Sequence, residues 1–499
     1  MALVVGAAAL MRPALAGYVE SPLTLQAATP EAGAQFGFAA ASADVNGDGY
    51  ADVIIGAPKA DFQGHADCGE VTVFLGPSLA GSVLLHAAAP EDGGYFGWSV
   101  TAADFNADGF ADVAAGSPYV GGLPAPGRVS VFFGPSLGAA VTIDSPESEP
   151  KASFGLSLGA ADVNGDGKAD LLVGAPGAAA GGEGRAGKSF VFLGPSFSTS
   201  YALQAPQPEA QTSFGTALAG ADIDGDGDDD VIVGAPDPGV DLQDPNSGLV
   251  FVFRAPSLDT VITLLDPEPQ PGAFFGRAVA GGKFNGDRYD DLLIGAFGSH
   301  RWPYAGAGRA FIFAAPLLSS FTVLEQPVIV ADSAYFGYEL TAADVNHDGY
   351  ADAVIGAHDA DISNPLAAGG GEANIFLGPS FQEAIHFQDP QPEPFAYFAR
   401  SIVAADVNGD GLGELIAGAP GSDVNGAADA GEAFVFFAEG TPDPQPVGGL
   451  AQPPEQANAL PGGSAGQDDS LGGWPTAVAA VAGVLALATV AHRLRRRSA

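Results

Sequence analysis

The sequence predicts an all-β protein: a seven-bladed β-propeller of four-stranded blades, closed by an N-terminal strand and followed by a single C-terminal transmembrane helix. Three observations lead to this prediction. One unit recurs seven times along the chain, each copy contains short strand patterns, and no segment of the repeats has convincing helical periodicity. The 71 Gly and 39 Pro residues supply the many turns that such a fold needs.

The composition excludes two classes of protein. Acidic residues outnumber Lys and Arg by 59 to 18, and a formal net charge of −41 excludes a general nucleic-acid binder, which needs a basic surface. A hydrophobic fraction of 47% and a charged fraction of 15% exclude a disordered acidic chain. Cys68 is the only cysteine, so no intrachain disulfide can form and another kind of cross-link has to hold the fold.

The first residues have the character of a secretory signal. Residues 1–10 are apolar, and Ala14-Leu15-Ala16 offers the small residues of a cleavage site. Residues 1–16 are therefore interpreted as a signal peptide-like segment. Arg12 lies after the apolar run rather than before it, which leaves the true start codon open.

The C-terminal end has the character of a membrane anchor. A Pro- and Gly-rich linker at 439–473, expected to be disordered, leads to a transmembrane or sorting helix at 474–492 and a basic cytoplasmic tail at 493–499. Gly472-Gly473, the apolar segment and the arginines together resemble bacterial C-terminal sorting tails. The sequence therefore predicts a secreted or cell-surface protein of the bacterial envelope, and cleavage of the tail stays open.

Between these ends, residues 17–438 are assigned to the propeller. The repeats align on the first residue of an acidic nonapeptide, and the steps between successive copies are 60, 58, 60, 61, 61 and 62 residues. The near-constant period indicates one supersecondary unit used seven times. The nonapeptides begin at Asp44, Asp104, Asp162, Asp222, Lys283, Asp344 and Asp406.

Each copy predicts its strands in the same order. An aromatic-Gly pair such as Phe36-Gly37 opens the unit, a strand of small residues follows, and the acidic nonapeptide comes next. A short apolar run then ends in Gly-Ala-Pro, as at residues 53–58, and predicts a buried strand. A third strand is predicted at 71–75, and a fourth at 83–87 precedes a Pro-Glu loop.

The seventh copy lacks a fourth strand after residues 433–437. The missing strand is predicted at the N-terminus, because residues 23–31 (LTLQAATPE) match residues 83–91 (VLLHAAAPE). Pairing this segment with the last blade would close the ring and remove an exposed sheet edge.

Six of the seven acidic nonapeptides have the pattern of a calcium loop. Side-chain oxygens at positions 1, 3, 5 and 9, with a carbonyl oxygen at position 7, form a set of hard ligands that suits Ca²⁺, while Mn²⁺ and Mg²⁺ stay open. Glycine at position 6 predicts a tight turn with positive φ. An EF-hand is excluded, because the last acid comes at position 9 and the flanking segments are strands.

About six ions are thus expected, one per regular loop. The predicted ligands are Asp44, Asn46, Asp48, Tyr50 and Asp52; Asp104, Asn106, Asp108, Phe110 and Asp112; Asp162, Asn164, Asp166, Lys168 and Asp170; Asp222, Asp224, Asp226, Asp228 and Asp230; Asp344, Asn346, Asp348, Tyr350 and Asp352; and Asp406, Asn408, Asp410, Leu412 and Glu414.

The fifth nonapeptide departs from this pattern and is predicted to hold no ion. Lys283 replaces the first acid, and Arg288 replaces the glycine of the turn. One hypothesis places the Lys283 ammonium roughly where the ion would lie, as a partner for Asp287 and Asp291. The alternative is a relaxed, solvated loop.

Together, the aromatic-Gly opening, the acidic loop and the Gly-Ala-Pro closing resemble FG-GAP repeats, those of the N-terminal propeller of integrin α-subunits. The resemblance covers residues 23–437. It implies that the metal loops lie on one face and that ligand is met on the other, at loops after Gly-Ala-Pro and before Phe-Gly. On that face, Trp302-Pro303-Tyr304 is the best candidate anchor for a ligand.

The sequence favours a calcium-stabilised, adhesion-type binding module of the cell surface, with a protein or glycan ligand and a membrane contact through its C-terminal helix. It predicts no enzyme, because the seven His residues occupy different places in the unit and no Ser-His-Asp or Cys-His pattern emerges. Two alternatives stay open: a secreted propeller enzyme acting on extracellular polymers, and a purely structural envelope protein. The oligomeric state is not determined by the sequence.

Overall fold

The computed structural model describes residues 17–439, apart from residues 20, 121–125, 139, 148, 238–246, 302–303, 328–333 and 361–368. The predicted signal segment, C-terminal helix and basic tail lie outside the described residues, and so does the predicted linker apart from its first residue, Glu439, which ends a strand instead of being disordered. Within the part of the chain that is described, no helix has the length and apolar character needed to span a bilayer.

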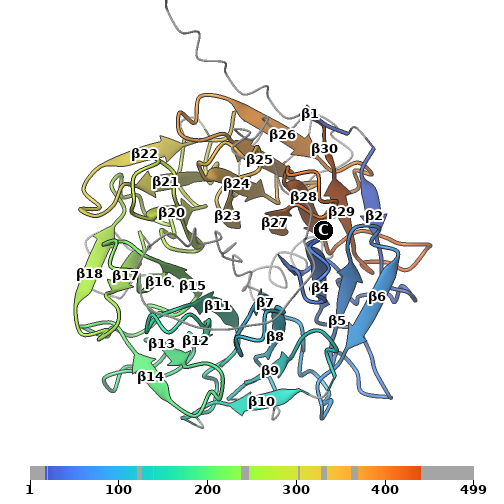
Figure 1. The fold of residues 1–499 in the computed structure, drawn as a ribbon, viewed down its shortest axis with the longest axis horizontal. Helices are drawn as coiled ribbons and strands as arrows, with labels where there is room; N and C mark the ends of the chain where they lie inside the picture. The colour runs from blue at the N-terminus through green and yellow to red at the C-terminus, as the bar shows by residue number, and fades with distance from the viewer. Residues whose placement is uncertain are drawn as a thin grey trace, which may run out of the picture.

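In the described residues, seven four-stranded antiparallel sheets stand around a central axis (Figure 1). One two-stranded sheet joins residues 17–18 to residues 438–439. The all-β, seven-bladed prediction is therefore confirmed. In blades one to six the four strands follow the chain from the axis outward, so each repeat contributes one sheet. This is the arrangement expected when one short supersecondary unit is used repeatedly around a ring.

The strand bounds follow the repeat. The first three blades contain β3 (Ala39–Ala43), β4 (Asp52–Ala57), β5 (Glu70–Leu75) and β6 (Gly81–Leu85); β7 (Val100–Ala103), β8 (Asp112–Ser117), β9 (Arg128–Phe132) and β10 (Val141–Asp144); and β11 (Ser157–Ala161), β12 (Asp170–Ala175), β13 (Lys188–Phe192) and β14 (Ser200–Leu203). The next three contain β15 (Ala217–Ala221), β16 (Asp230–Ala235), β17 (Leu249–Phe253) and β18 (Val261–Leu265); β19 (Val279–Gly282), β20 (Asp291–Ala296), β21 (Arg309–Phe313) and β22 (Phe321–Leu324); and β23 (Leu340–Ala343), β24 (Asp352–Ala357), β25 (Glu372–Phe376) and β26 (Ala384–Gln388). The seventh contains β27 (Ser401–Ala405), β28 (Glu414–Ala419), β29 (Glu432–Phe436) and β2 (Leu23–Leu25).

The second strand of each blade is the most deeply buried. Every residue of β4 is buried, whereas β6 at the rim exposes most of its residues. A strand that packs on neighbouring blades with both faces needs apolar residues in succession rather than in alternation. This explains the continuous apolar runs that precede Gly-Ala in the sequence.

The N-terminal strand completes the last blade, as the sequence predicts. β2 pairs with β29 in antiparallel register, with Leu23 opposite Val435 and Leu25 opposite Ala433. A second pairing, which the sequence analysis did not anticipate, joins β1 (Gly17–Tyr18) to β30 (Ala438–Glu439). The two ends of the propeller chain are thus tied together twice, and the edge of β29 is covered.

The Phe-Gly and Gly-Ala-Pro motifs meet at the blade interfaces. A Cβ atom on Gly56, in β4, would lie 2.1 Å from the carbonyl oxygen of Gly97, in the Phe-Gly pair of the next blade. The last interface is built the same way, since a Cβ on Gly418 would lie 2.0 Å from the Gly37 oxygen. The two motifs recur because glycine permits this close backbone approach. The phenylalanines of the pairs fill the space between blades and are fully buried.

Candidate metal centre: a ring of acidic loops

The seven acidic loops lie at one end of the propeller, where the first strand of each blade turns into the second. The backbone N–H at position 8 of each loop donates to a backbone carbonyl of the preceding loop, over 2.8–3.2 Å. The seven pairs, donor first, are Ala51 and Asp406, Ala111 and Asp44, Ala169 and Asp104, Asp229 and Asp162, Asp290 and Asp222, Ala351 and Lys283, and Gly413 and Val345. The loops therefore form a closed ring, which we call the loop ring.

Inside each regular loop, the acids fold the backbone around themselves. In the first loop, Asp44 Oδ2 accepts the N–H of Gly49 (2.9 Å), Asn46 Oδ1 accepts that of Asp48 (2.8 Å), and Asp48 Oδ1 accepts that of Tyr50 (3.1 Å). The same three bonds recur in the second and seventh loops. The side chains at positions 1, 3 and 5 are held on the inside of one turn, as the ligand prediction requires.

The turn geometry agrees with the sequence prediction. The position 6 glycines of the six regular loops have φ between 80° and 97°. The backbone at position 4 also has positive φ, although this position is Ala107 in the second loop and His347 in the sixth. Small or polar residues at two alternate positions thus set the shape of the loop.

Position 9 has a structural role that the ligand prediction did not include. Asp52 is completely buried; its Oδ2 accepts the N–H of Val45 (3.0 Å), and its Oδ1 accepts that of Gly76 (2.8 Å), beyond the third strand. The equivalent acids in the second, third, sixth and seventh loops make the same two links. The closing acid therefore joins its loop to the far end of β5 or its counterpart.

Burial makes these acids hard to ionise when no cation is near. Loss of hydration raises the pKa of Asp52, Asp112 and Asp170 to about 6, that of Glu414 to about 7 and that of Asp352 to about 8. The acids at positions 1 and 5 of the same loops add to the rise. A bound cation would offset both effects.

The donors present fit a hard divalent cation. In the fourth loop, oxygen atoms of Asp222, Asp224 and Asp226 all lie within 4.8 Å of one another. Position 3 is Asn in the other six loops, and in four of them its Nδ2 donates to the position 5 carboxylate. Carboxylate, amide and carbonyl oxygens gathered on a short turn are the ligands that Ca²⁺ takes.

In four loops position 7 is aromatic and packs on the preceding loop, so only its carbonyl oxygen is available as a ligand. A Cβ atom on Gly47 would lie 2.4 Å from the Phe110 ring, and one on Gly409 would lie 2.4 Å from the Tyr50 ring. Tyr289 and Tyr350 cover Gly225 and Gly286 in the same way. In the fourth loop position 7 is Asp228, whose carboxylate lies against Gly165 of the preceding loop. Where position 4 carries a side chain, as at Ala107 and His347, position 7 of the next loop is Lys168 or Leu412 rather than an aromatic residue.

The fifth loop differs from the others because it carries two basic side chains, those of Lys283 and Arg288. Lys283 Nζ lies 2.7 Å from Asp290 Oδ1, so the structure pairs this lysine with position 8 and not with Asp287 or Asp291, the partners suggested by the sequence. Arg288 does not take positive φ, and its guanidinium lies over the Tyr289 ring at 4.7 Å. The turn at position 6 therefore differs from that of the regular loops.

Arg254 is a residue that the sequence analysis missed. Its guanidinium lies 2.7 Å from Asp230 Oδ2 and 3.1 Å from Asp224 Oδ2, so it reaches two predicted ligands of the fourth loop. It comes directly after β17, at the place occupied by Leu75, Phe133, Leu193, Ala314, Leu377 and Phe437 in the other blades. Aligning the repeats through the third strand would have revealed this exception.

The opposite face carries a buried cluster around the axis. The residues after the Phe-Gly pairs meet here: the Arg400 guanidinium lies 4.4 Å from the Phe38 ring centroid and 5.1 Å from that of Tyr338, and it donates to Glu339 (3.1 Å). Arg277 lies 4.1 Å from the Tyr338 ring. Of the predicted anchor, Tyr304 is half-buried, and Trp302 and Pro303 lie outside the described residues.

Comparison with known proteins agrees with this geometry. The FG-GAP repeat model matches residues 36–74, 96–132, 154–192, 214–253, 336–374 and 398–436, each from the Phe-Gly pair to the third strand of a blade. The fifth blade, with Lys283 and Arg288 in its loop, is not among the matched segments.

Two groups of curated proteins resemble this chain. Human phosphatidylinositol-glycan-specific phospholipase D is 33% identical over 214 residues, 38% of this chain and 25% of that protein. Integrin alpha-5 of Xenopus laevis is 30% identical over 278 residues (53% and 25%), and human integrin alpha-IIb is 40% identical over 157 residues (29% and 15%). The matched parts thus span a quarter or less of these relatives.

Among solved structures, the rhamnogalacturonan lyase YesW aligns with 83% of this chain and 75% of its own at 14% identity, with a TM-score of 0.40. The six matched repeats and the integrin α relatives identify this chain as an FG-GAP repeat protein with an integrin α-like β-propeller.

Proposed function

We propose that this chain is a calcium-stabilised binding module of the cell surface. It would present a protein or glycan ligand with the loops of the face opposite the acidic loops, where the Phe-Gly pairs lie. The observation that carries the proposal is the loop ring: seven turns are joined to one another, and six of them share one design, with acids at positions 1, 5 and 9. The integrin α relatives support the same role.

Calcium would be held by the side chains at positions 1, 3, 5 and 9 and the position 7 carbonyl of the six regular loops. Bound there, the ion would neutralise carboxylates that burial and mutual repulsion otherwise destabilise. The protein's own residues supply the rest: the position 1, 3 and 5 side chains shape the turn, and the position 9 acid fixes the turn to the third strand. The ion would thus stabilise the face opposite the ligand without touching the ligand.

The loops that follow the Gly-Ala-Pro motifs differ in length, and the proposed ligand face also carries the packed cluster of Phe38, Tyr338 and Arg400. A rigid scaffold that carries variable loops is the usual design of a binding surface. The proposal includes no catalytic role, and it places the protein outside the cell with a membrane contact through the C-terminal segment.

A glycan and protein array, probed with and without Ca²⁺, tests this function. We expect specific capture that EGTA abolishes and that Tyr304→Ala weakens. Tyr201→Ala is the matched control, because Tyr201 is 45% exposed on the outer strand β14, away from the loops of either end. Turnover of a polysaccharide or phosphoester in a parallel screen would instead favour an enzyme, and the absence of both binding and turnover would favour a structural role.

A further inference from the structure

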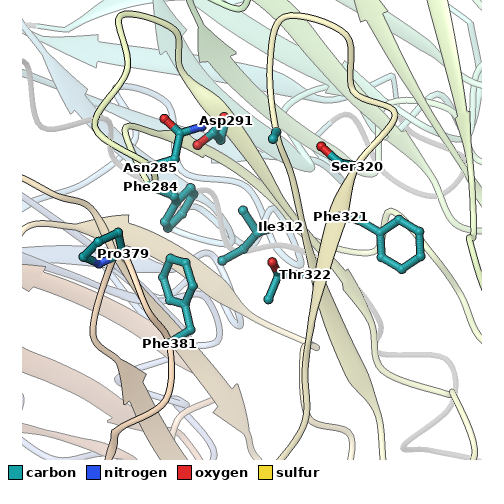
Figure 2. Close-up of a pocket in the computed structure, with 10 residues that line it drawn as sticks. Phe284, Asn285, Asp291, Ile312, Ser320, Phe321, Thr322, Pro379 and Phe381 are labelled. Carbon is teal, nitrogen blue, oxygen red and sulfur yellow. Dashed lines mark hydrogen bonds between the residues drawn. The ribbon is translucent and has the colours of Figure 1, made fainter.

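A pocket of about 150 Å³ lies beside the fifth acidic loop, between blade five and the turn after β25 in blade six (Figure 2). Asn285 and Asp291 lie at one end of it, Phe284 and Phe381 form a wall, and Ile312 lies between. The Phe284 and Phe381 rings meet edge to face with centroids 5.9 Å apart, so this wall is fixed by packing. Ser320 and Thr322 also line the pocket, which thus combines one end with a carboxylate and a body that is mostly apolar.

The pocket is linked to one substitution in the repeat. Ala314, which lines it, stands directly after β21, at the place where the other six blades have Leu75, Phe133, Leu193, Arg254, Leu377 and Phe437. A methyl group therefore replaces a large side chain in this blade alone. The volume that the large side chain would occupy is left to the pocket.

The polar end of the pocket holds a carboxylate oxygen that lacks a partner. Asp291 is 1% exposed; its Oδ1 accepts the N–H of Ala315 (2.9 Å) and the Nδ2 of Asn285 (3.1 Å), whereas its Oδ2 has no hydrogen-bond partner among the described residues. Lys283, from the same loop, is paired with Asp290. A buried carboxylate oxygen without a hydrogen-bond donor is unfavourable, so a positively charged or hydrogen-bond-donating group beside Asp291 Oδ2 would stabilise it.

Blade four shows which group fits. There the equivalent acid, Asp230, also uses Oδ1 for a backbone N–H, that of Ala255 (2.8 Å), and its Oδ2 binds the guanidinium of Arg254 at 2.7 Å. Arg254 occupies the position of Ala314. In blade four, the position that corresponds to Ala314 thus supplies a positively charged group to the acid that corresponds to Asp291.

We propose that this pocket binds a small alkylammonium ion, whose charged head pairs with Asp291 Oδ2 and whose apolar chain lies against Phe284, Ile312 and Phe381. A cavity of about 150 Å³ holds a ligand of roughly six heavy atoms, the size of benzene. The head group takes the role that the Arg254 guanidinium has in blade four. The chemistry is shared by free amines and by the side chain of a lysine in a peptide.

Titration calorimetry on the full chain, saturated with calcium so that the loops are filled, tests the proposal with n-pentylammonium and with 1-pentanol, its neutral counterpart of equal size. We expect a dissociation constant on the order of 1 mM for the ammonium and binding at least about tenfold weaker for the alcohol. A third arm with Nα-acetyl-lysine amide distinguishes the two sources: tighter binding than pentylammonium points to a peptide, and weaker binding points to a free amine.

Three variants complete the test. Ala314→Leu fills the pocket with the residue that three other blades carry at this place, and it should lower the affinity for pentylammonium at least about tenfold. Asp291→Asn keeps the shape and should remove the preference for the ammonium over the alcohol. Leu317→Ala, on the same turn but 82% exposed, should leave binding unchanged.

Equal binding of the ammonium and the alcohol to the unaltered chain, or unchanged binding in Ala314→Leu, would overturn the proposal. So would the absence of any heat with pentylammonium at tens of millimolar. If Asp291→Asn fails to fold, Ala314→Leu still decides, because the fold already accommodates leucine there in blades one, three and six.

Discussion

We expect Lys283 and Arg288 to keep the fifth loop from binding an ion. The double substitution Lys283→Asp and Arg288→Gly restores the first acid and the left-handed turn residue of the regular loops. We expect native mass spectrometry to count six calcium ions on the unaltered chain and seven on the variant. Lys283→Gln is the control, because it removes the charge without supplying a carboxylate. A seventh ion on the unaltered chain would contradict this assignment.

Gly56 shows how little room the blade interface leaves. A Cβ atom at this position would lie 2.1 Å from the Gly97 carbonyl oxygen, so Gly56→Ala has to separate blades one and two. We expect the free energy of unfolding to fall by about 1–3 kcal/mol, as in other overpacked sites. Chemical denaturation measures it. Gly81→Ala is the control in the same blade, because a Cβ there meets nothing within 4 Å; equal losses in both variants would refute the packing argument.

Individual residues were predictable where the repeat repeats them. The turn glycines and the Asp and Asn side chains at positions 1, 3 and 5 fall where their spacing places them, because short-range geometry alone determines the turn. The partner of Lys283 was not predictable, because a long side chain can reach several acids of its own loop. The contacts of Arg254 were not predictable, because they join the end of the third strand to the loop and depend on strand register. The hydrogen bond that Asp52 accepts from the backbone of Gly76 was not predictable either, because Gly76 lies 24 residues further along the chain.

At the scale of the elements, β2 is the part whose removal should matter most. Without residues 23–29, β29 exposes an edge lined by Ala433, Phe434 and Val435, and the last blade keeps three strands. We expect a broader thermal transition at lower temperature, together with aggregation, in calorimetry and light scattering. Leu23→Thr/Leu25→Thr serves as a milder variant that keeps the backbone pairing. A truncated chain that melts as sharply and as high as the parent would show that closure does not depend on β2.

The strands themselves could be predicted almost completely, because their apolar runs and turns recur seven times. The β1–β30 pairing could not, because two residues on each side carry no pattern that distinguishes a strand from a loop. Its existence follows from the ring: once β2 and β29 are paired, residues 17–18 and 438–439 are brought side by side.

For the whole molecule, removal of calcium should lower stability. If each site has a dissociation constant of about 10⁻⁴–10⁻³ M, as in extracellular modules, about 2 mM Ca²⁺ stabilises the fold by roughly 0.6–1.8 kcal/mol per site. The melting temperature should therefore fall in EGTA and recover when excess Ca²⁺ is added. Mg²⁺ at the same concentration serves as the comparison. A melting temperature that EGTA leaves unchanged would contradict a stabilising role for the loops.

The ion-free molecule should also respond to pH. Burial raises the pKa of Asp52 to about 6, that of Glu414 to about 7 and that of Asp352 to about 8. A carboxyl group whose pKa is higher in the folded state contributes stability below its unfolded pKa of about 4 and loses it as pH rises through the folded value. The melting temperature of ion-stripped protein should therefore decline from pH 5 to pH 8, and Ca²⁺ should suppress the decline. A rise over the same range would contradict the assignment.

The loop ring has a consequence for how such a repeat array can change over time. Its seven links are made by backbone groups: the carbonyl of Lys283 accepts from Ala351, and the N–H of Asp290 donates to Asp222, although the fifth loop has lost two residues of the shared pattern. A copy can thus accumulate substitutions in its side chains while its neighbours still find the same partners. Substitutions can therefore accumulate in one blade without disturbing the others. A loop that no longer binds an ion would keep its backbone hydrogen bonds to the neighbouring loops, and its side chains could then take on another function.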